Sequence, residues 1–180
     1  MKYKKEYQQM HDRHLFRAWK GNYDDRVIGM VKKHVKINGS KTLLDFGSGS
    51  GDQYKIGKVN EQFGISADNV VCYDPGVKEF EVLPDQMFDC IISTDVMEHI
   101  PEEELPDVIK YITTHARHFA YIVVFCGLAV KKFPDGTNVH VTIKRPDWWK
   151  EQFAKYNESG IPVYLNFKWP GDPKMNILNL

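Results

Sequence analysis

A glycine-rich turn at residues 45–51 contains the first residues whose types and spacing could do chemistry. The run Leu43-Leu44-Asp45-Phe46 is typical of a short buried strand, and Gly47, Gly49 and Gly51 follow it at alternate positions. Glycine permits positive φ and lets the backbone approach a bound molecule closely. The pattern therefore predicts a ligand-binding turn that leads into a helix, with a plain strand-to-helix turn as the alternative. Asp45 favours the binding turn because its carboxylate stands where the strand ends.

A second carboxylate, Asp74, ends the next apolar run, Val70-Val71-Cys72-Tyr73. In nucleotide-binding βαβ units, a carboxylate about 20 residues after the glycines binds a ribose hydroxyl. Asp74-Pro75-Gly76 is also good turn chemistry, so a capped turn is the alternative. The nearby glycine turn favours the ribose role.

A third polar group follows the apolar run Phe88–Thr94 and contains Asp95, Glu98 and His99. Open α/β sheets bind ligands at the carboxyl ends of their central strands, so this group is expected to face the same ligand. His140 lies in the segment after the later apolar run Phe119–Cys126.

Composition limits what these residues can serve. The 180 residues are 42% hydrophobic and 13% aromatic, which suits one α/β core and is short for two domains. The 24 basic and 24 acidic residues balance, so net charge favours neither nucleic acid nor an anionic membrane as a partner. No apolar stretch approaches the roughly 20 residues of a membrane span, and the start lacks the apolar core of a signal peptide. We expect one cytoplasmic domain, residues 1–180, with its three cysteines reduced in the core.

The elements that must position these residues alternate between strand and helix. The pattern predicts an N-terminal helical cap over residues 1–38 and an α/β core over 40–180, with right-handed crossovers and helices on both faces of a parallel sheet. The expected strands are 42–46, 70–73, 88–94, 119–126 and a C-terminal antiparallel pair, 163–168 and 175–178. The expected helices are two within 4–36, one at 53–63, one at 102–117 and one from about 145, with Asp147 as its N-cap.

Three of these stretches, in this order, resemble the motifs of class I S-adenosylmethionine-dependent methyltransferases. Residues 43–51 are similar to the first motif, Cys72-Tyr73-Asp74 to the second acidic position, and residues 88–100 to the fourth-strand motif. The resemblance covers residues 40–126 and implies a Rossmann-like seven-stranded sheet, mostly parallel with a C-terminal antiparallel strand. Because only Pro75 to Met87 separate the second and fourth-strand motifs, the third strand is expected to be short or vestigial.

The resemblance implies S-adenosyl-L-methionine as the cofactor. The glycine turn would cradle its methionine moiety, Asp74 would hold the ribose hydroxyls, and the end of the fourth-strand motif would face the transferable methyl. The cofactor-binding residues expected on this basis are Asp45, Gly47, Ser48, Gly49, Gln53, Tyr54, Asp74, Pro75, Asp95 and Val96.

An oxygen or nitrogen acceptor can also need a base, and histidine suits that role at neutral pH, so the expected catalytic residues are His140, His99 and Asp95. Residues 138–149 are similar to a stretch of ubiquinone-pathway O-methyltransferases, and more loosely to one in methyltransferases of the 3′-terminal 2′-hydroxyl of small RNAs. In those relatives an acid-x-x-Glu-His set ligates Mg²⁺, joined in the RNA enzymes by the later histidine. The matching residues here are Asp95, Glu98, His99 and His140, so the resemblance admits Mg²⁺ or another divalent metal. Alternatively, His140 only bonds a strand carbonyl.

The expected acceptor is a small molecule or a sugar or glycan hydroxyl, because the neutral net charge disfavours nucleic acid. Thr94-Asp95-Val96 at the fourth-strand motif is unlike the motifs of nucleic-acid base methyltransferases, so base methylation is disfavoured. Side chains expected to recognise it are His11, His14, His99, His140, Trp148 and Trp149, although adjacent tryptophans are also typical of packing. Two alternatives stay open: an RNA 3′-terminal 2′-O-methyltransferase with a divalent metal, and a non-catalytic S-adenosylmethionine-binding protein. The sequence leaves the oligomeric state open.

Overall fold

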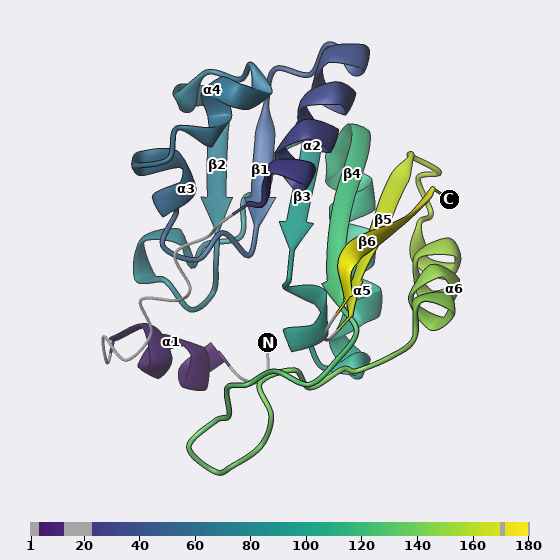
Figure 1. The fold of residues 1–180 in the computed structure, drawn as a ribbon. Coiled ribbons are helices and arrows are strands. Elements are labelled where there is room, and N and C mark those ends of the chain that lie inside the picture. Colours follow the sequence, from purple (N-terminus) through teal and green to yellow (C-terminus); the bar gives the residue numbers. More distant parts are fainter. Residues whose placement is uncertain (1–3, 13–22, 170–171, 180) are drawn as a thin grey trace. The chain divides into compact units, whose positions relative to one another are not determined.

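The structure is a computed structural model that describes residues 4–12, 23–169 and 172–179, with side chains for 4–9 and 23–169. The chain forms two compact units, Tyr3–Ile92 and Ser93–Leu180, which are treated in turn. Figure 1 shows the elements of both.

Three parallel strands form the sheet of the Tyr3–Ile92 unit. β1 (Leu43–Phe46) pairs on one side with β2 (Val70–Tyr73) and on the other with β3 (Phe88–Thr94), whose last two residues belong to the second unit. All four β1 residues are buried, as expected for an apolar run in the middle of a parallel sheet. The strands predicted at 42–46, 70–73 and 88–94 are confirmed.

Two helices precede β1, as predicted: α1 (Lys4–Asp12) and α2 (Asp25–Asn38). Asp24 is the N-cap of α2, and its carboxylate accepts the N–H of Val27 at 2.9 Å. Gly39 is the C-cap and takes the left-handed conformation with φ 64°. The buried face of α2 carries valines one turn apart, Val27, Val31 and Val35.

The single helix predicted at 53–63 is wrong. The chain forms two short helices instead, α3 (Asp52–Lys55) and α4 (Val59–Phe63). The chain turns at Gly57 in a way that only glycine permits, because a Cβ there would lie 2.9 Å from the Gln53 carbonyl oxygen. Lys58 then takes a left-handed φ of 48°, which ends the helical path.

Residues 75–87 contain no strand in the structure. The 3₁₀ turn η1 (Ala67–Asn69) leads into β2. Between the end of β2 and the start of β3, the only regular element is the 3₁₀ turn η2 (Lys78–Phe80). The described residues therefore hold six strands, and the expectation of seven is wrong. The segment is short and opens on Pro75 and Gly76, which favour a turn over a strand.

The Ser93–Leu180 unit continues with the 3₁₀ turns η3 (Met97–His99) and η4 (Glu102–Glu104), then α5 (Leu105–His115) and β4 (Ala116–Phe125). α6 (Pro146–Tyr156) and β5 (Val163–Trp169) follow, and β6 (Asp172–Asn179) lies beside β5. β4 and β5 pair in parallel, and α5 contacts both β4 and α6 (Figure 1). Trp149 and Phe153 of α6 are fully buried in this unit's core.

The fold is thus mixed α/β of the general Rossmann-like kind, with β1 to β5 forming a five-strand, all-parallel sheet. The prediction of Asp147 as the N-cap of α6 is wrong, because Arg145 occupies the N-cap and Asp147 lies in the first turn. Among the described residues, no helix combines the length and apolar character needed to cross a bilayer.

Candidate functional sites

The glycine turn after β1 is held against the end of β2. Gly47 and Gly49 take positive φ values of 87° and 59°, and the N–H groups of Gly47 and Ser48 donate to the Tyr73 carbonyl at 2.7 and 3.1 Å. Gly51 has φ 72°, and a Cβ on it would lie 3.2 Å from the Phe80 ring. The positive φ values favour glycine at all three positions, and at Gly51 a Cβ would also crowd the Phe80 ring.

The carboxylate of Asp74 bonds both to the glycine turn and to the turn that Asp74 itself begins. Its Oδ2 accepts the N–H of Gly49 and its Oδ1 accepts the N–H of Gly76, both at 2.8 Å. These are the bonds of a capped turn. Each carboxylate oxygen has two lone pairs, so these bonds do not exhaust its capacity to accept hydroxyl donors. Beside it, the Pro75 carbonyl accepts the side-chain N–H of Gln8 from α1 at 3.2 Å.

Asp45 lies on β1, just before the glycine turn, and is 1% exposed. Gln53 donates to its Oδ2 at 2.8 Å, and the hydroxyls of Tyr23 and Tyr54 also bond to it. Burial raises the pKa of Asp45 to about 6, although the three donors act in the opposite direction. Gln53 and Tyr54, both predicted to touch a cofactor, therefore bond to Asp45, which is predicted to touch it too. Sequence reasoning missed Tyr23, which no motif marks.

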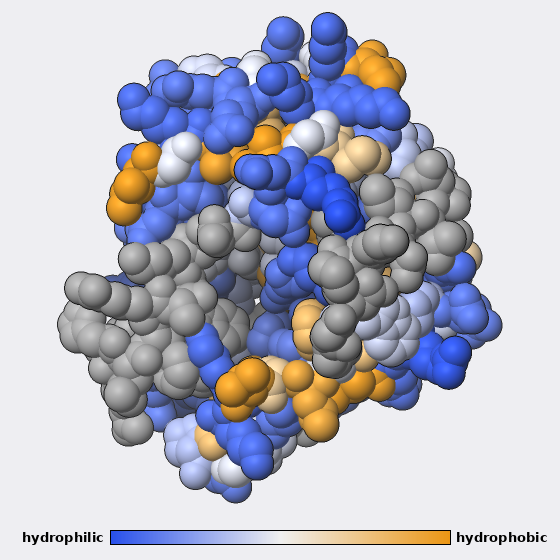
Figure 2. Space-filling view, viewed as in Figure 1, coloured by the Kyte–Doolittle hydropathy of each residue, from blue (hydrophilic) through white to orange (hydrophobic). Residues whose placement is uncertain are grey.

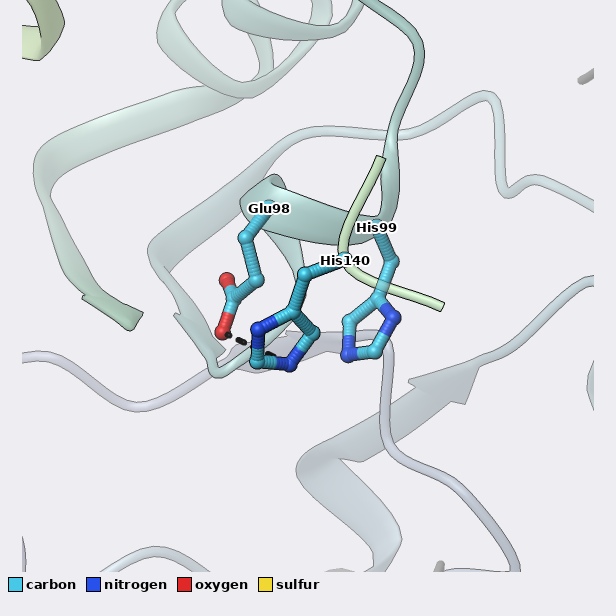
Figure 3. A group of neighbouring side chains, drawn as sticks. All are labelled: Glu98, His99 and His140. Carbon is cyan, nitrogen blue, oxygen red and sulfur yellow. Dashed lines mark ion pairs between the residues drawn. The ribbon is translucent and has the colours of Figure 1, made fainter. Parts of the chain in front are cut away.

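A second cluster lies in the other unit and consists of Glu98, His99 and His140 (Figure 3). Glu98 and His99 come from η3, directly after β3, and His140 comes from the segment after β4. One ligand atom from each residue lies within 4.8 Å of the others, and the two imidazole rings meet edge to face at 4.7 Å. The turn and the later segment thus bring together three of the four residues predicted to bind a metal.

Backbone carbonyls set the tautomers of both histidines. His99 Nδ1 lies 2.9 Å from the Val139 carbonyl oxygen, and His140 Nδ1 lies 2.6 Å from the Gly127 carbonyl oxygen. Because a carbonyl can only accept, each Nδ1 carries the proton and each Nε2 carries the lone pair. Metal-binding histidines are commonly oriented in this way. His140 does bond a carbonyl, but that of Gly127, which lies just after β4 and not in a strand as the alternative expected; the bond uses Nδ1 and not Nε2.

Glu98 is the most unusual residue of the cluster, because its carboxylate is fully buried. Its Oε1 accepts the Phe125 N–H at 3.1 Å and lies 4.0 Å from His140 Nε2. Its Oε2 has no hydrogen-bond partner among the described residues. Burial first, and the charge of Asp95 second, raise the pKa of Glu98 well above its usual range. Burial lowers the pKa of His99 to about 3, with His140 adding to the effect, so this imidazole is neutral at physiological pH.

Asp95, the fourth predicted ligand, is outside the cluster. Its Oδ2 accepts from the ammonium of Lys168 on β5 at 2.8 Å. Sequence reasoning missed Lys168, since the two residues are 73 positions apart and no motif includes it. The neighbouring Val96 is half-buried at the start of η3, where its carbonyl accepts the His99 N–H.

The aromatic residues predicted to contact an acceptor have different surroundings. Trp149 is completely buried, so its expected contact with an acceptor is wrong and packing explains it. Trp148 is partly exposed, and the ammonium of Lys144 lies 4.9 Å from its ring centre. The side chains of His11 and His14 lie outside the described residues.

Exposed apolar side chains occur on the segment that carries His140. Leu128 is 68% exposed and Val130 fully so, directly after Gly127, and Ile143 is 38% exposed. Figure 2 shows apolar surface at the lower edge of the view, where the loop after β4 lies in Figure 1. Lys131 and Lys132 follow in the same loop, so the surface is apolar and basic.

Comparison with protein-family models, with curated proteins and with solved structures gave no match to this chain.

Proposed function

We propose that this protein is an S-adenosylmethionine-dependent methyltransferase that moves a methyl group to an oxygen, or a nitrogen, of a small-molecule, sugar or glycan acceptor. The observation that carries the proposal is the glycine turn after β1, tied through Gly49 to the carboxylate of Asp74 after β2. The proposed fold is that of a class I enzyme that lacks one strand, with β6 as its C-terminal antiparallel strand. The register supports this direction, since Tyr164 is opposite Asn179 while Phe167 is opposite Asn176.

The proposed donor site uses backbone more than side chains. Gly47 and Gly49 have no Cβ atoms, so a methionine moiety would fit against their backbone, and Asp74 would accept from the ribose hydroxyls. Gln53 donates both to Asp45 and to the Ser48 carbonyl of the turn, and Asp45, Gln53 and Tyr54 act as positioning residues in this proposal. When bound, the donor supplies a methyl group on a positively charged sulfur, which an acceptor atom displaces.

The proposed acceptor chemistry rests on Glu98, His99 and His140, which fit a divalent metal. They offer two imidazole Nε2 lone pairs and a buried carboxylate whose Oε2 has no partner among the described residues, and a buried carboxylate is costly without a cation. A bound ion would lower the pKa of an acceptor hydroxyl. Without an ion, the His140 Nε2 could itself take the proton of the acceptor.

Two features of the loop after β4 bear on the acceptor. The exposed Leu128 and Val130 favour an acceptor with an apolar part. Lys131 and Lys132 are the features that favour the alternative, a metal-dependent 2′-O-methyltransferase of RNA 3′ ends. Incubation with methyl-labelled donor and either RNA oligonucleotides or a metabolite extract would separate the two, since the label would move to one pool.

The first test is calorimetry with S-adenosylhomocysteine, the product form of the donor. We expect saturable binding, and at least tenfold weaker binding in Asp74→Asn, which keeps one oxygen acceptor and the size of the side chain but loses the charge. Asp68→Asn is the matched control, because Asp68 is an exposed aspartate in η1. Absence of binding to the wild-type protein at near-millimolar ligand would reject the proposal.

A second measurement tests the metal. We expect Mn²⁺ to bind the wild-type protein and to bind His140→Ala at least tenfold more weakly. His115→Ala is the control, since His115 also bonds a carbonyl through Nδ1, that of Tyr111, but belongs to no ligand cluster among the described residues. Donor and metal binding without methyl transfer to any acceptor would favour the non-catalytic alternative.

A further inference from the structure

Asp95 has a backbone conformation that is unusual for an aspartate. It directly follows β3, its φ is 56°, and its N–H donates to the Val123 carbonyl of β4 at 2.9 Å. Few non-glycine residues take this left-handed conformation, and those that do recur at functional sites. The contacts around Asp95 hold it in this conformation.

The ammonium of Lys168 is the main partner of the Asp95 carboxylate. The two atoms lie 2.8 Å apart, and the side chains are 26% and 41% exposed, so the ion pair is only partly screened by water. The second oxygen of Asp95, Oδ1, is buried and has no hydrogen-bond partner among the described residues. One oxygen is thus neutralised and the other still has acceptor capacity.

Asp95 also lies close enough to Glu98 to influence it. The charge of Asp95 raises the pKa of Glu98, and the charge of Lys168 lowers it. Yet no Asp95 oxygen belongs to the group of ligand atoms that lie within 4.8 Å of one another. Asp95 is therefore a neighbour of the cluster but not a member of it.

We infer that Lys168 withholds the Asp95 carboxylate from the metal, so that the ion is held by Glu98, His99 and His140 alone. Metal sites that act on substrates keep coordination positions open, whereas a fourth protein ligand would fill one of them. Lys168 is a positioning residue in this scheme: it lowers the affinity for the metal and preserves a position for the acceptor oxygen. The inference rests on the proposed metal site of the previous subsection.

A double-mutant cycle tests the inference, with Mn²⁺ as the probe and the signal of free Mn²⁺ in electron paramagnetic resonance as the readout. The four proteins are the wild type, Lys168→Met, Asp95→Asn and the double variant. We expect Lys168→Met to tighten Mn²⁺ binding at least tenfold, because Asp95 becomes available as a ligand. Asp95→Asn should change the affinity less than threefold in the wild type and at least tenfold in Lys168→Met.

Equal effects of Asp95→Asn in both backgrounds would overturn the inference, since Lys168 would then act only through its charge. A large loss from Asp95→Asn in the wild type would also overturn it, because Asp95 would already be a ligand. Lys144→Met is the matched control: it removes a lysine that pairs with Glu102 in the same unit, and it should leave Mn²⁺ binding unchanged. If the wild type binds no Mn²⁺, the proposed metal site itself fails, which is a distinct result.

Discussion

Burial changes the pKa of Asp45 more strongly than its hydrogen bonds do. Three donors, Gln53, Tyr23 and Tyr54, each favour the ionised carboxylate, yet the pKa of Asp45 rises from 3.8 to about 6 because the side chain is removed from water. A buried carboxylate is costly in its charged form. Gln53, which donates to Asp45, also donates to the Ser48 carbonyl at 3.1 Å and so links Asp45 to the glycine turn.

This shift of the Asp45 pKa makes the stability of the protein depend on pH. Between pH 4 and 6 the folded protein binds more protons at Asp45 than the unfolded chain does, so raising the pH favours unfolding. Asp45 alone should lower the free energy of unfolding by about 3 kcal/mol across this interval, with no further change above it. Urea unfolding followed by circular dichroism from pH 4 to 7 measures the effect as a difference between the wild type and Asp45→Asn.

Asp45→Asn removes the titration while it keeps an oxygen that can accept from Gln53. We expect its free energy of unfolding to fall less than that of the wild type between pH 4 and 6. Above pH 7, the plots of unfolding free energy against pH for the two proteins should run parallel. Parallel curves over the whole range would show that the folded environment does not shift the titration of Asp45.

At the scale of elements, local sequence predicted strands better than helices. The runs at 43–46, 70–73 and 88–94 are apolar enough that burial in a parallel sheet is their natural outcome, and each forms the expected strand. The single helix predicted at 53–63 is wrong because its apolar periodicity continues across Gly57, where the chain divides into α3 and α4. A glycine inside a helical pattern weakens the helix and favours such a break.

In the candidate sites, local sequence likewise predicts some residues but not their partners. The motifs predicted that Asp74, Glu98 and His99 follow strand ends, and the structure places them directly after β2 and in the turn after β3. The partners that decide what those residues do, such as Lys168 for Asp95, come from distant elements. A pairing across 73 positions depends on how strands pack, and no local pattern encodes it.

Helix α2 offers a test of how an element is held. The Asp24 carboxylate satisfies the N–H of Val27, one of the N–H groups that a helix start leaves without a partner within the helix. Asp24→Ala should lower the free energy of unfolding by about 1 kcal/mol in urea. Asp25→Ala is the control, because it removes the same charge from the first turn without removing the cap. Equal losses would mean that charge, and not the hydrogen bond, stabilises this end.

At the scale of the whole molecule, the chain forms two units, and each has one candidate site after its parallel strands. The glycine turn and Asp74 belong to Tyr3–Ile92, whereas Glu98, His99 and His140 belong to Ser93–Leu180. β3 is the strand that continues from one unit into the other, and the residues after it begin the second site. Donor and metal are therefore expected to leave separate signatures on the chain.

Amide hydrogen exchange can locate these signatures. The N–H groups of Gly47, Ser48 and Gly49 bond to Tyr73 and Asp74, so S-adenosylhomocysteine should slow exchange in peptides that cover the glycine turn. The N–H groups of Phe125 and Thr142 bond to Glu98, so Mn²⁺ should slow exchange in peptides that cover these two residues. Binding that rigidifies a site raises the cost of its local opening, which is what exchange measures. Protection of the glycine turn by Mn²⁺ alone, with no change at Phe125 and Thr142, would assign the ion to other ligands and would contradict the division of donor and metal between the two units.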